Sequence, residues 1–96
     1  MELGTSALST PPATRRIGVI GVVITDRQAA AGLVNRVLSD FSSIIVGRQG
    51  VPYRDRGIAV ISLIVDGTSD QLGAMTGRLG AIDGVLVKAA LTTYET

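Results

Sequence analysis

The chain contains no cysteine, no histidine and no tryptophan, and its aromatic residues are limited to Phe41, Tyr53 and Tyr94. Without thiolate or imidazole groups it lacks the usual ligands of zinc and iron–sulfur sites, so we predict no metal and no cofactor. The same absence excludes disulfide bonds and nucleophilic catalysis by a Ser-His or Cys-His pair. Because histidine is the usual proton-transfer group near neutral pH, we predict no catalytic residues and no enzyme activity.

An excess of charge of one sign is also lacking. The 96 residues include 9 basic and 8 acidic side chains, a net charge of +1, so we expect no direct nucleic-acid partner. The two apolar runs, Ile17–Ile24 and Ile58–Val65, are far shorter than the roughly 20 residues of a spanning helix. Glu2 stands where a secretory leader has basic residues, so we expect no signal peptide. These features predict one small cytoplasmic domain with no membrane partner.

The first 14 residues differ in character from the rest of the chain. Met1–Thr14 is rich in serine and threonine and contains Pro11 and Pro12. Consecutive prolines block both helix formation and strand pairing. We expect residues 1–14 to form a disordered tail, with a functional arm as the alternative, and residues 15–96 to form the folded domain.

The rest of the chain contains an internal repeat. Residues 17–24 read IGVIGVVI and residues 58–65 read IAVISLIV, two runs typical of buried strands. A helix-start signal follows each run, TDRQ at 25–28 and TSDQ at 68–71. In each signal we expect the threonine to be the N-cap and the glutamine to complete a capping box.

Two amphipathic helices are predicted after these signals, because apolar residues recur at spacings of three and four. These residues are Ala30, Leu33, Val34, Val37, Leu38 and Phe41 in the first helix, and Leu72, Met75, Leu79 and Ile82 in the second. The second helix also contains Gly73, Gly77 and Gly80, each costing roughly 1 kcal/mol relative to alanine. We interpret these glycines as points of close approach to the sheet or to another chain, with fraying at Gly80 as the alternative. Asp83-Gly84 is expected to end this helix.

Further strand patterns occupy Ile44–Tyr53 and Val85–Thr92, and residues 53–57 have the composition of a hairpin loop. The resulting order is βαββαβ. With right-handed crossovers this order predicts an α+β, ferredoxin-like fold, a four-stranded antiparallel sheet with both helices on one face. We expect the first and third strands to be central and parallel to each other, and the second and fourth to be edges.

Both sides of the two central strands are apolar. The first strand has Ile17, Val19 and Val23 on one side and Ile20, Val22 and Ile24 on the other. The third strand has Ile58, Val60 and Ile64 on one side and Ala59, Ile61, Leu63 and Val65 on the other. Two helices cover only one face of such a sheet, and a face in water normally alternates apolar with polar residues. Burying about six such residues, each worth roughly 1.5–3 kcal/mol, outweighs the cost of association. We therefore predict a homo-oligomer through the open sheet face, with coverage by the N-terminal tail as the alternative.

The best candidate binding site is the tract IVGRQGVPYR at residues 45–54. Arginine suits bidentate capture of carboxylate or phosphate, and Gly47 and Gly50 let a ligand approach an edge strand. The alternatives are a solvated edge, with arginines paired to Asp55 or Asp83, and a contact between subunits. The candidate ligand-binding residues are Arg48, Tyr53 and Arg54, followed by Asp26 and Arg27.

Five tracts are distinctive in combination. They are VITDR at 23–27, IVGRQGVPYR at 45–54, the strand at 58–65, GAMTGRLG at 73–80 and GVLVK at 84–88. Together they resemble the small ACT-like family of iron-only hydrogenase system regulators, over about residues 15–93. The resemblance implies an ACT-like fold, similar to the regulatory domain of nickel-responsive repressors, and assembly into dimers or tetramers. It does not extend to nickel sensing, because the histidine and cysteine ligands are missing.

These observations lead to two functional hypotheses. The first is a non-catalytic regulatory module in which a small anionic or amino-acid-like effector binds near a subunit interface and changes the assembly. The second is a structural or interaction module that binds a protein of a hydrogenase system without any small ligand.

Overall fold

A computed structural model describes residues 15–93, and the predicted tail at residues 1–14 lies outside the described residues. The strands and helices are β1 (Arg15–Ile24), α2 (Arg27–Asp40), β2 (Ile45–Tyr53), β3 (Ile58–Thr68), α3 (Ser69–Gly80) and β4 (Val85–Leu91). Short 3-10 turns, Ser42–Ile44 and Arg54–Arg56, precede and follow β2. No helix within residues 15–93 is long and apolar enough to cross a membrane.

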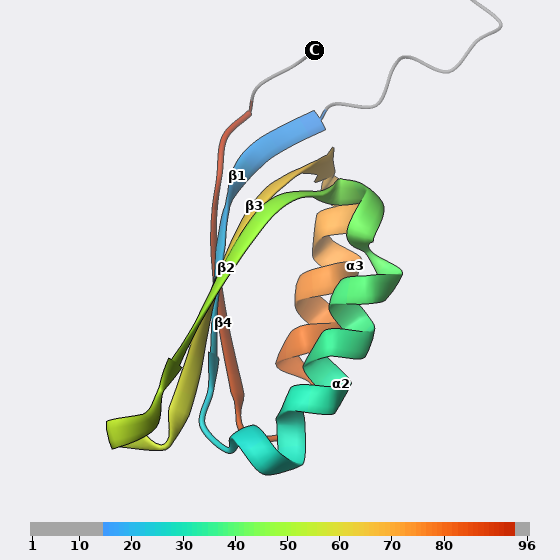
Figure 1. The fold of residues 1–96 in the computed structure, drawn as a ribbon. Coiled ribbons are helices and arrows are strands. Elements are labelled where there is room, and N and C mark those ends of the chain that lie inside the picture. Colours follow the sequence, from blue (N-terminus) through green and yellow to red (C-terminus); the bar gives the residue numbers. More distant parts are fainter. Residues whose placement is uncertain (1–14, 94–96) are drawn as a thin grey trace, which may run out of the picture.

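The four strands form one sheet in the order β2-β3-β1-β4, with every neighbouring pair antiparallel. Figure 1 shows α2 and α3 side by side on the same face of this sheet. The predicted ferredoxin-like βαββαβ fold and its two edge strands are therefore confirmed. The prediction that the central strands run parallel is wrong, because β1 and β3 are antiparallel. The α2 crossover makes β2 parallel to β1, and β3, which returns from β2 through a tight turn, must oppose both.

The hydrophobic core lies between the sheet and the two helices. The buried strand residues are Ile20, Val22, Ile24, Ile61, Leu63, Val65 and Val85, and the buried helix residues are Ala30, Val34, Val37, Leu38, Leu72, Met75 and Leu79. The predicted division of β1 and β3 into two sides is thus confirmed, with the helices covering the side of Ile20 and Leu63. Leu33 departs from the predicted helix stripe, since it is 54% exposed. It lies roughly 100° around the helix axis from Val34 and falls outside the face that meets the sheet.

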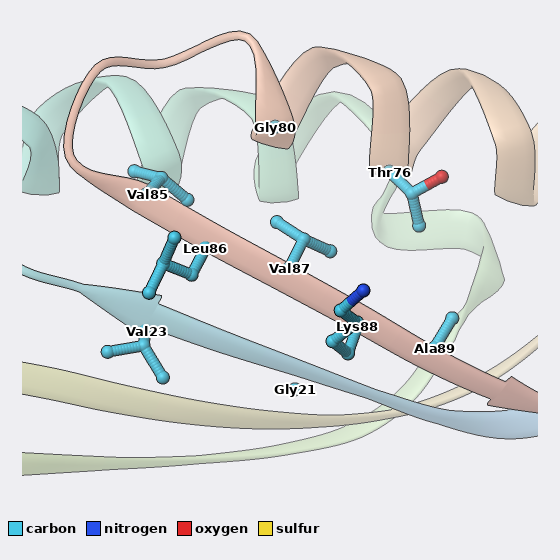
Figure 2. A pocket seen from close by; sticks show the side chains of 9 residues that line it. All are labelled: Gly21, Val23, Thr76, Gly80, Val85, Leu86, Val87, Lys88 and Ala89. Carbon is cyan, nitrogen blue, oxygen red and sulfur yellow. The ribbon is translucent and has the colours of Figure 1, made fainter.

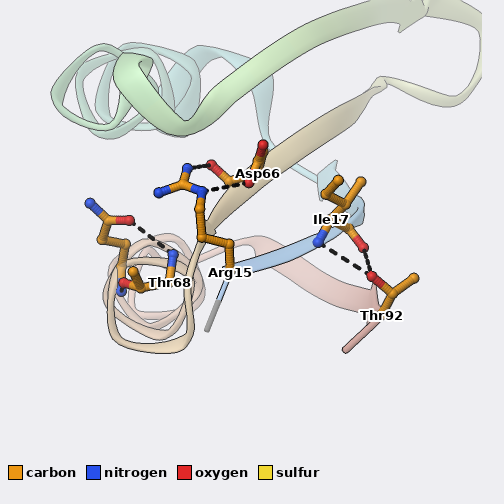
Figure 3. Close-up of polar contacts among 6 residues, drawn as sticks. Arg15, Ile17, Asp66, Thr68 and Thr92 are labelled. Carbon is orange, nitrogen blue, oxygen red and sulfur yellow. Dashed lines mark hydrogen bonds and ion pairs between the residues drawn. The ribbon is translucent and has the colours of Figure 1, made fainter. Parts of the chain in front are cut away.

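The two helix starts differ. At α3 the capping box is confirmed: Gln71 N donates to Thr68 Oγ1 at 3.1 Å, and Thr68 N donates to Gln71 Oε1 at 2.9 Å (Figure 3). At α2 the predicted Thr25 cap is wrong, because Asp26 is the N-cap and its carboxylate accepts from Ala29 N at 3.2 Å. Thr25 instead donates through both its backbone N–H and its hydroxyl to the Gly84 carbonyl, at 2.7 and 2.8 Å. These bonds join the end of β1 to the start of β4.

The turn before β4 needs glycine. Gly84 has φ +80°, and a Cβ built there would lie 3.1 Å from Thr25 Oγ1. The prediction that Asp83-Gly84 ends α3 is wrong, because the helix ends at Gly80 and two further residues, Ala81 and Ile82, intervene. In α3 itself, Cβ atoms built at Gly73, Gly77 and Gly80 meet no atom within 4 Å. The close approach to the sheet predicted for these glycines is therefore also wrong.

Candidate functional site

A groove of about 210 Å³ runs between α2 and the β2–β3 part of the sheet. From α2 it is lined by Arg27, Ala31 and Asn35, which share one helix face because they are four residues apart. Arg48 reaches the same groove from β2 and donates through Nη2 to Asn35 Oδ1 at 3.3 Å. The register explains this placement: Arg48 pairs with Leu63, a residue buried under the helices, so its side chain projects to the helix side.

The groove combines an apolar floor with cationic walls. Ile24, Ala59 and Ile61 form part of its lining, and the guanidinium groups of Arg27 and Arg48 supply the charge. Within residues 15–93 the ion pairs are Arg15–Asp66, at 2.9 Å, and Arg78–Asp40, at 2.8 Å. The pairing of the β2 arginines with Asp55 or Asp83, one of the alternatives from the sequence, is therefore not formed. Within the described residues neither Arg27 nor Arg48 forms an ion pair, and Arg48 donates to the neutral amide oxygen of Asn35.

The remaining candidate residues lie elsewhere. Tyr53 alternates away from the groove onto the other side of β2, and the Arg56 guanidinium carbon lies 5.9 Å from its ring centroid. Arg54 belongs to the 3-10 turn that follows. Asp26 has a structural task as the N-cap of α2. The structure thus brings Arg27 and Arg48 together and separates them from the other three.

Asn35 was missed by the sequence reasoning. Its position two helical turns after Arg27 was the available signal, but it identifies a site only once the strand facing α2 is known. Among residues 15–93, no three acidic side chains gather closely enough to hold a metal ion.

The second feature is the side of the sheet that the helices leave uncovered, which we call the open face. It consists of Ile17, Val19, Gly21 and Val23 on β1, Gly47, Gln49, Val51 and Tyr53 on β2, Ile58, Val60, Ser62 and Ile64 on β3, and Leu86, Lys88 and Ala90 on β4. Val19 is 47% exposed, Ile64 is 50% exposed and Leu86 is 62% exposed. Their cross-strand neighbours are also apolar, since Val19 pairs with Ile64 and Ala90, and Val23 pairs with Val60 and Leu86. The apolar residues therefore form a continuous surface.

The profile of a family described as "TM1266-like: Iron-only hydrogenase system regulator, putative" matches residues 16–89. The chain belongs to this family. The predicted resemblance is confirmed, and the match includes both helices and all or most of each of the four strands. Comparison with curated proteins gave no match.

The solved structures that resemble this chain include the following two. The uncharacterized protein TM1266 from Thermotoga maritima has a TM-score of 0.78 and 38% sequence identity, covering 80% of this chain and 96% of its own. The apo form of CPII from Thiomonas intermedia K12, a nitrogen regulatory PII-like protein, has a TM-score of 0.51 and 9% identity. That match covers 84% of this chain and 95% of CPII. The similarity to CPII extends to the fold alone, which is PII-like.

Proposed function

We propose that this member of the iron-only hydrogenase system regulator family is a non-catalytic sensor. It assembles through the open face and binds a small anionic or amino-acid-like effector in the groove between α2 and β2. The observation on which the proposal mainly rests is the open face itself, an apolar surface that the two helices of the chain do not cover.

The exposed apolar residues of the open face make a second copy its proposed cover. Val19, Ile64 and Leu86 are each about half exposed, as are Val51 and Tyr53 on β2. Covering half of a large aliphatic side chain contributes about 1 kcal/mol. In an isologous pair every residue contributes twice, so five residues give about 10 kcal/mol before the cost of association, roughly 4–15 kcal/mol, is subtracted. The gain falls within the range of the cost, so association through the open face would be of marginal strength, which an effector could modulate.

The groove supports binding of an anion. Arg27 and Arg48 approach it from opposite walls, and Asn35 holds the Arg48 guanidinium through an amide oxygen rather than a charge. A carboxylate or phosphate would replace that neutral acceptor with a charged one and gain a hydrogen bond roughly twice as strong. The apolar floor at Ile24 and Ile61 would contact a short hydrocarbon portion of the effector.

The groove and the open face share strand β2. Arg48 and Pro52 lie on its groove side, whereas Gln49 and Tyr53 lie on the open face. An anion that draws Arg48 toward α2 would therefore shift the neighbouring residues of the assembly surface. This shared strand is the physical route by which effector binding would change the strength of association.

Thermal denaturation with a panel of probes tests effector binding. Inorganic phosphate, short-chain carboxylates and amino acids are added to the wild type, to Arg48→Ala and to the control Arg36→Ala, an exposed α2 residue outside the groove. We expect one probe class to raise the melting temperature of the wild type and the control but not of Arg48→Ala. Equal stabilisation of Arg48→Ala would contradict the site. Loss of stabilisation in Arg54→Ala instead would move the site to the turn after β2. No response to any probe from an intact oligomer would favour the module without a small ligand.

A further inference from the structure

The outer edge of β4 combines a strand edge with a groove beside α3. β4 is the last strand of the sheet order, and no described strand pairs with its outer side. A groove of about 850 Å³ follows this edge, and a smaller one of about 220 Å³ continues it toward the start of α3. Figure 2 shows Val85 and Val87 turned toward α3, with Leu86 and Val23 on the other side of the strand. The lining thus wraps around the edge, as expected where an added strand would place alternate side chains on both sides.

Within residues 15–93, backbone groups of β4 along this edge have no strand partner. In an antiparallel pair, residues alternate between those bonded to the neighbour and those directed away from it. Thr25 N bonds to Gly84 O at 2.7 Å and Thr92 N bonds to Ile17 O at 3.0 Å, which fixes the alternation at both ends of the β1–β4 ladder. The residues bonded to β1 are therefore Leu86, Lys88 and Ala90. Val87 and Ala89 direct their N–H and C=O groups outward.

The side of α3 that flanks this edge has almost no side-chain bulk. Ser69, Gly73, Thr76 and Gly80, at spacings of four, three and four, line the two grooves. Gly73 and Gly80 have open space at their Cβ positions, so no contact within residues 15–93 requires glycine there. Glycine also disfavours a helix. A bare helix side that no described part of the chain contacts is explained if the backbone of a second copy approaches it.

From these observations we infer that β4 pairs with β4 of a second copy, in antiparallel register centred on Val87, so that two sheets join into one. This seam would bury the bare sides of the two α3 helices against each other. The register on Val87 lets its N–H and C=O bond to their equivalents in the second copy. On the open face it places Lys88 opposite Leu86, whereas a register centred on Lys88 would oppose two like charges.

The spacing of the elements sets a condition on this arrangement. The two β4 strands would lie one strand spacing apart, about 4.8 Å, whereas two packed helices lie about 8–10 Å apart. Each α3 therefore has to lie toward β1 from its own β4, and small residues at the contact permit the closer end of that range. The opposite edge strand does not offer the same surface, because β2 contains Pro52 and a register shift between Ile45 and Gly47.

The seam is tested with substitutions that leave the single chain intact. Gly80→Lys and Gly73→Lys place long cations at the seam, in positions where the chain itself has no neighbouring atom. Lysine favours the helix over glycine, and at position 80 it also lies at the favourable C-terminal end. Gly32→Lys makes the same exchange on α2 in open space and is the matched control. We expect Gly80→Lys and Gly73→Lys each to raise the seam dissociation constant about a hundredfold or more, and Gly32→Lys to leave it unchanged.

The readouts are molar mass by light scattering and amide hydrogen exchange. Ile64→Glu, on the open face, is run in parallel so that the seam and the open-face assembly are separated. If both interfaces form, the wild type has four copies, and both Gly80→Lys and Ile64→Glu reduce it to two. Loss of a dimer in Gly80→Lys alone supports the seam and contradicts the open-face assembly. A dimer that Ile64→Glu disrupts and Gly80→Lys does not, or a monomeric wild type, would overturn the seam. In the supported cases the Val87 and Ala89 amides exchange slowly in the wild type and rapidly in Gly80→Lys.

Discussion

Replacing Ile64 with glutamate tests the open-face assembly most directly. Ile64 lies on the central strand β3, opposite Val19, and half of its side chain is exposed in the single chain. Covering the exposed half contributes about 1 kcal/mol, hence about 2 kcal/mol for the two copies in an isologous pair. Glutamate forfeits this and adds a desolvated carboxylate in each copy, which costs at least about 1 kcal/mol apiece. Asp66, two residues along the same side of the strand, is already paired with Arg15, so it offers repulsion rather than a partner.

The total, about 4 kcal/mol, corresponds to a dissociation constant raised about a thousandfold. The assay is light scattering or sedimentation across a dilution series, with circular dichroism to verify that the variant is folded. Leu33→Glu is the matched control, because Leu33 is equally exposed but lies on α2 away from the sheet. The reasoning is refuted if Ile64→Glu and Leu33→Glu associate as strongly as the wild type, or if the wild type is a monomer at micromolar concentration.

Two further predictions concern stability, both measured by urea denaturation. Thr68→Ala removes one half of the α3 capping box and should lower the free energy of unfolding by about 1 kcal/mol. The control Ser69→Ala, one residue later, should have little effect. Equal effects of the two substitutions would contradict the cap assignment. Gly84→Ala should lower the free energy of unfolding by about 1–2 kcal/mol, because residue 84 has a φ of +80°. The control Gly32→Ala, in open space on α2, should raise the free energy of unfolding by up to about 1 kcal/mol. An unchanged free energy of unfolding in Gly84→Ala would show that the turn adapts.

Much of this architecture was predictable from the sequence because it depends on local patterns. The two strand runs at residues 17–24 and 58–65, each followed by a cap signal and a helical stripe, specify βαββαβ order. The alternation of side chains along a strand, with period two, divided β1 and β3 correctly into a buried and an exposed side. The α3 cap was also predictable, since its bonds join residues three apart.

What the sequence could not specify depends on contacts between distant residues. Thr25 was predicted to cap α2, but it bonds to Gly84, which is 59 residues away, and Asp26 becomes the cap instead. The candidate ligand residues were grouped by sequence proximity, which joined Arg48 to Tyr53 and Arg54. In the structure Arg48 lies on the helix side of β2, Tyr53 lies on the open face and Arg54 lies in the following turn. Only the packing of α2 over β2 brings Arg27 and Asn35 to Arg48.

By itself, the sequence determined that this is a ferredoxin-like domain with an apolar sheet face that its own helices do not cover. Hydrophobic period and capping chemistry decide such features within a few residues of each position. The tertiary structure alone decided the strand directions, the composition of the groove and the bare side of α3 beside the β4 edge. These features arise where elements far apart in the chain meet. A sequence pattern does not specify how such elements are placed relative to one another in space.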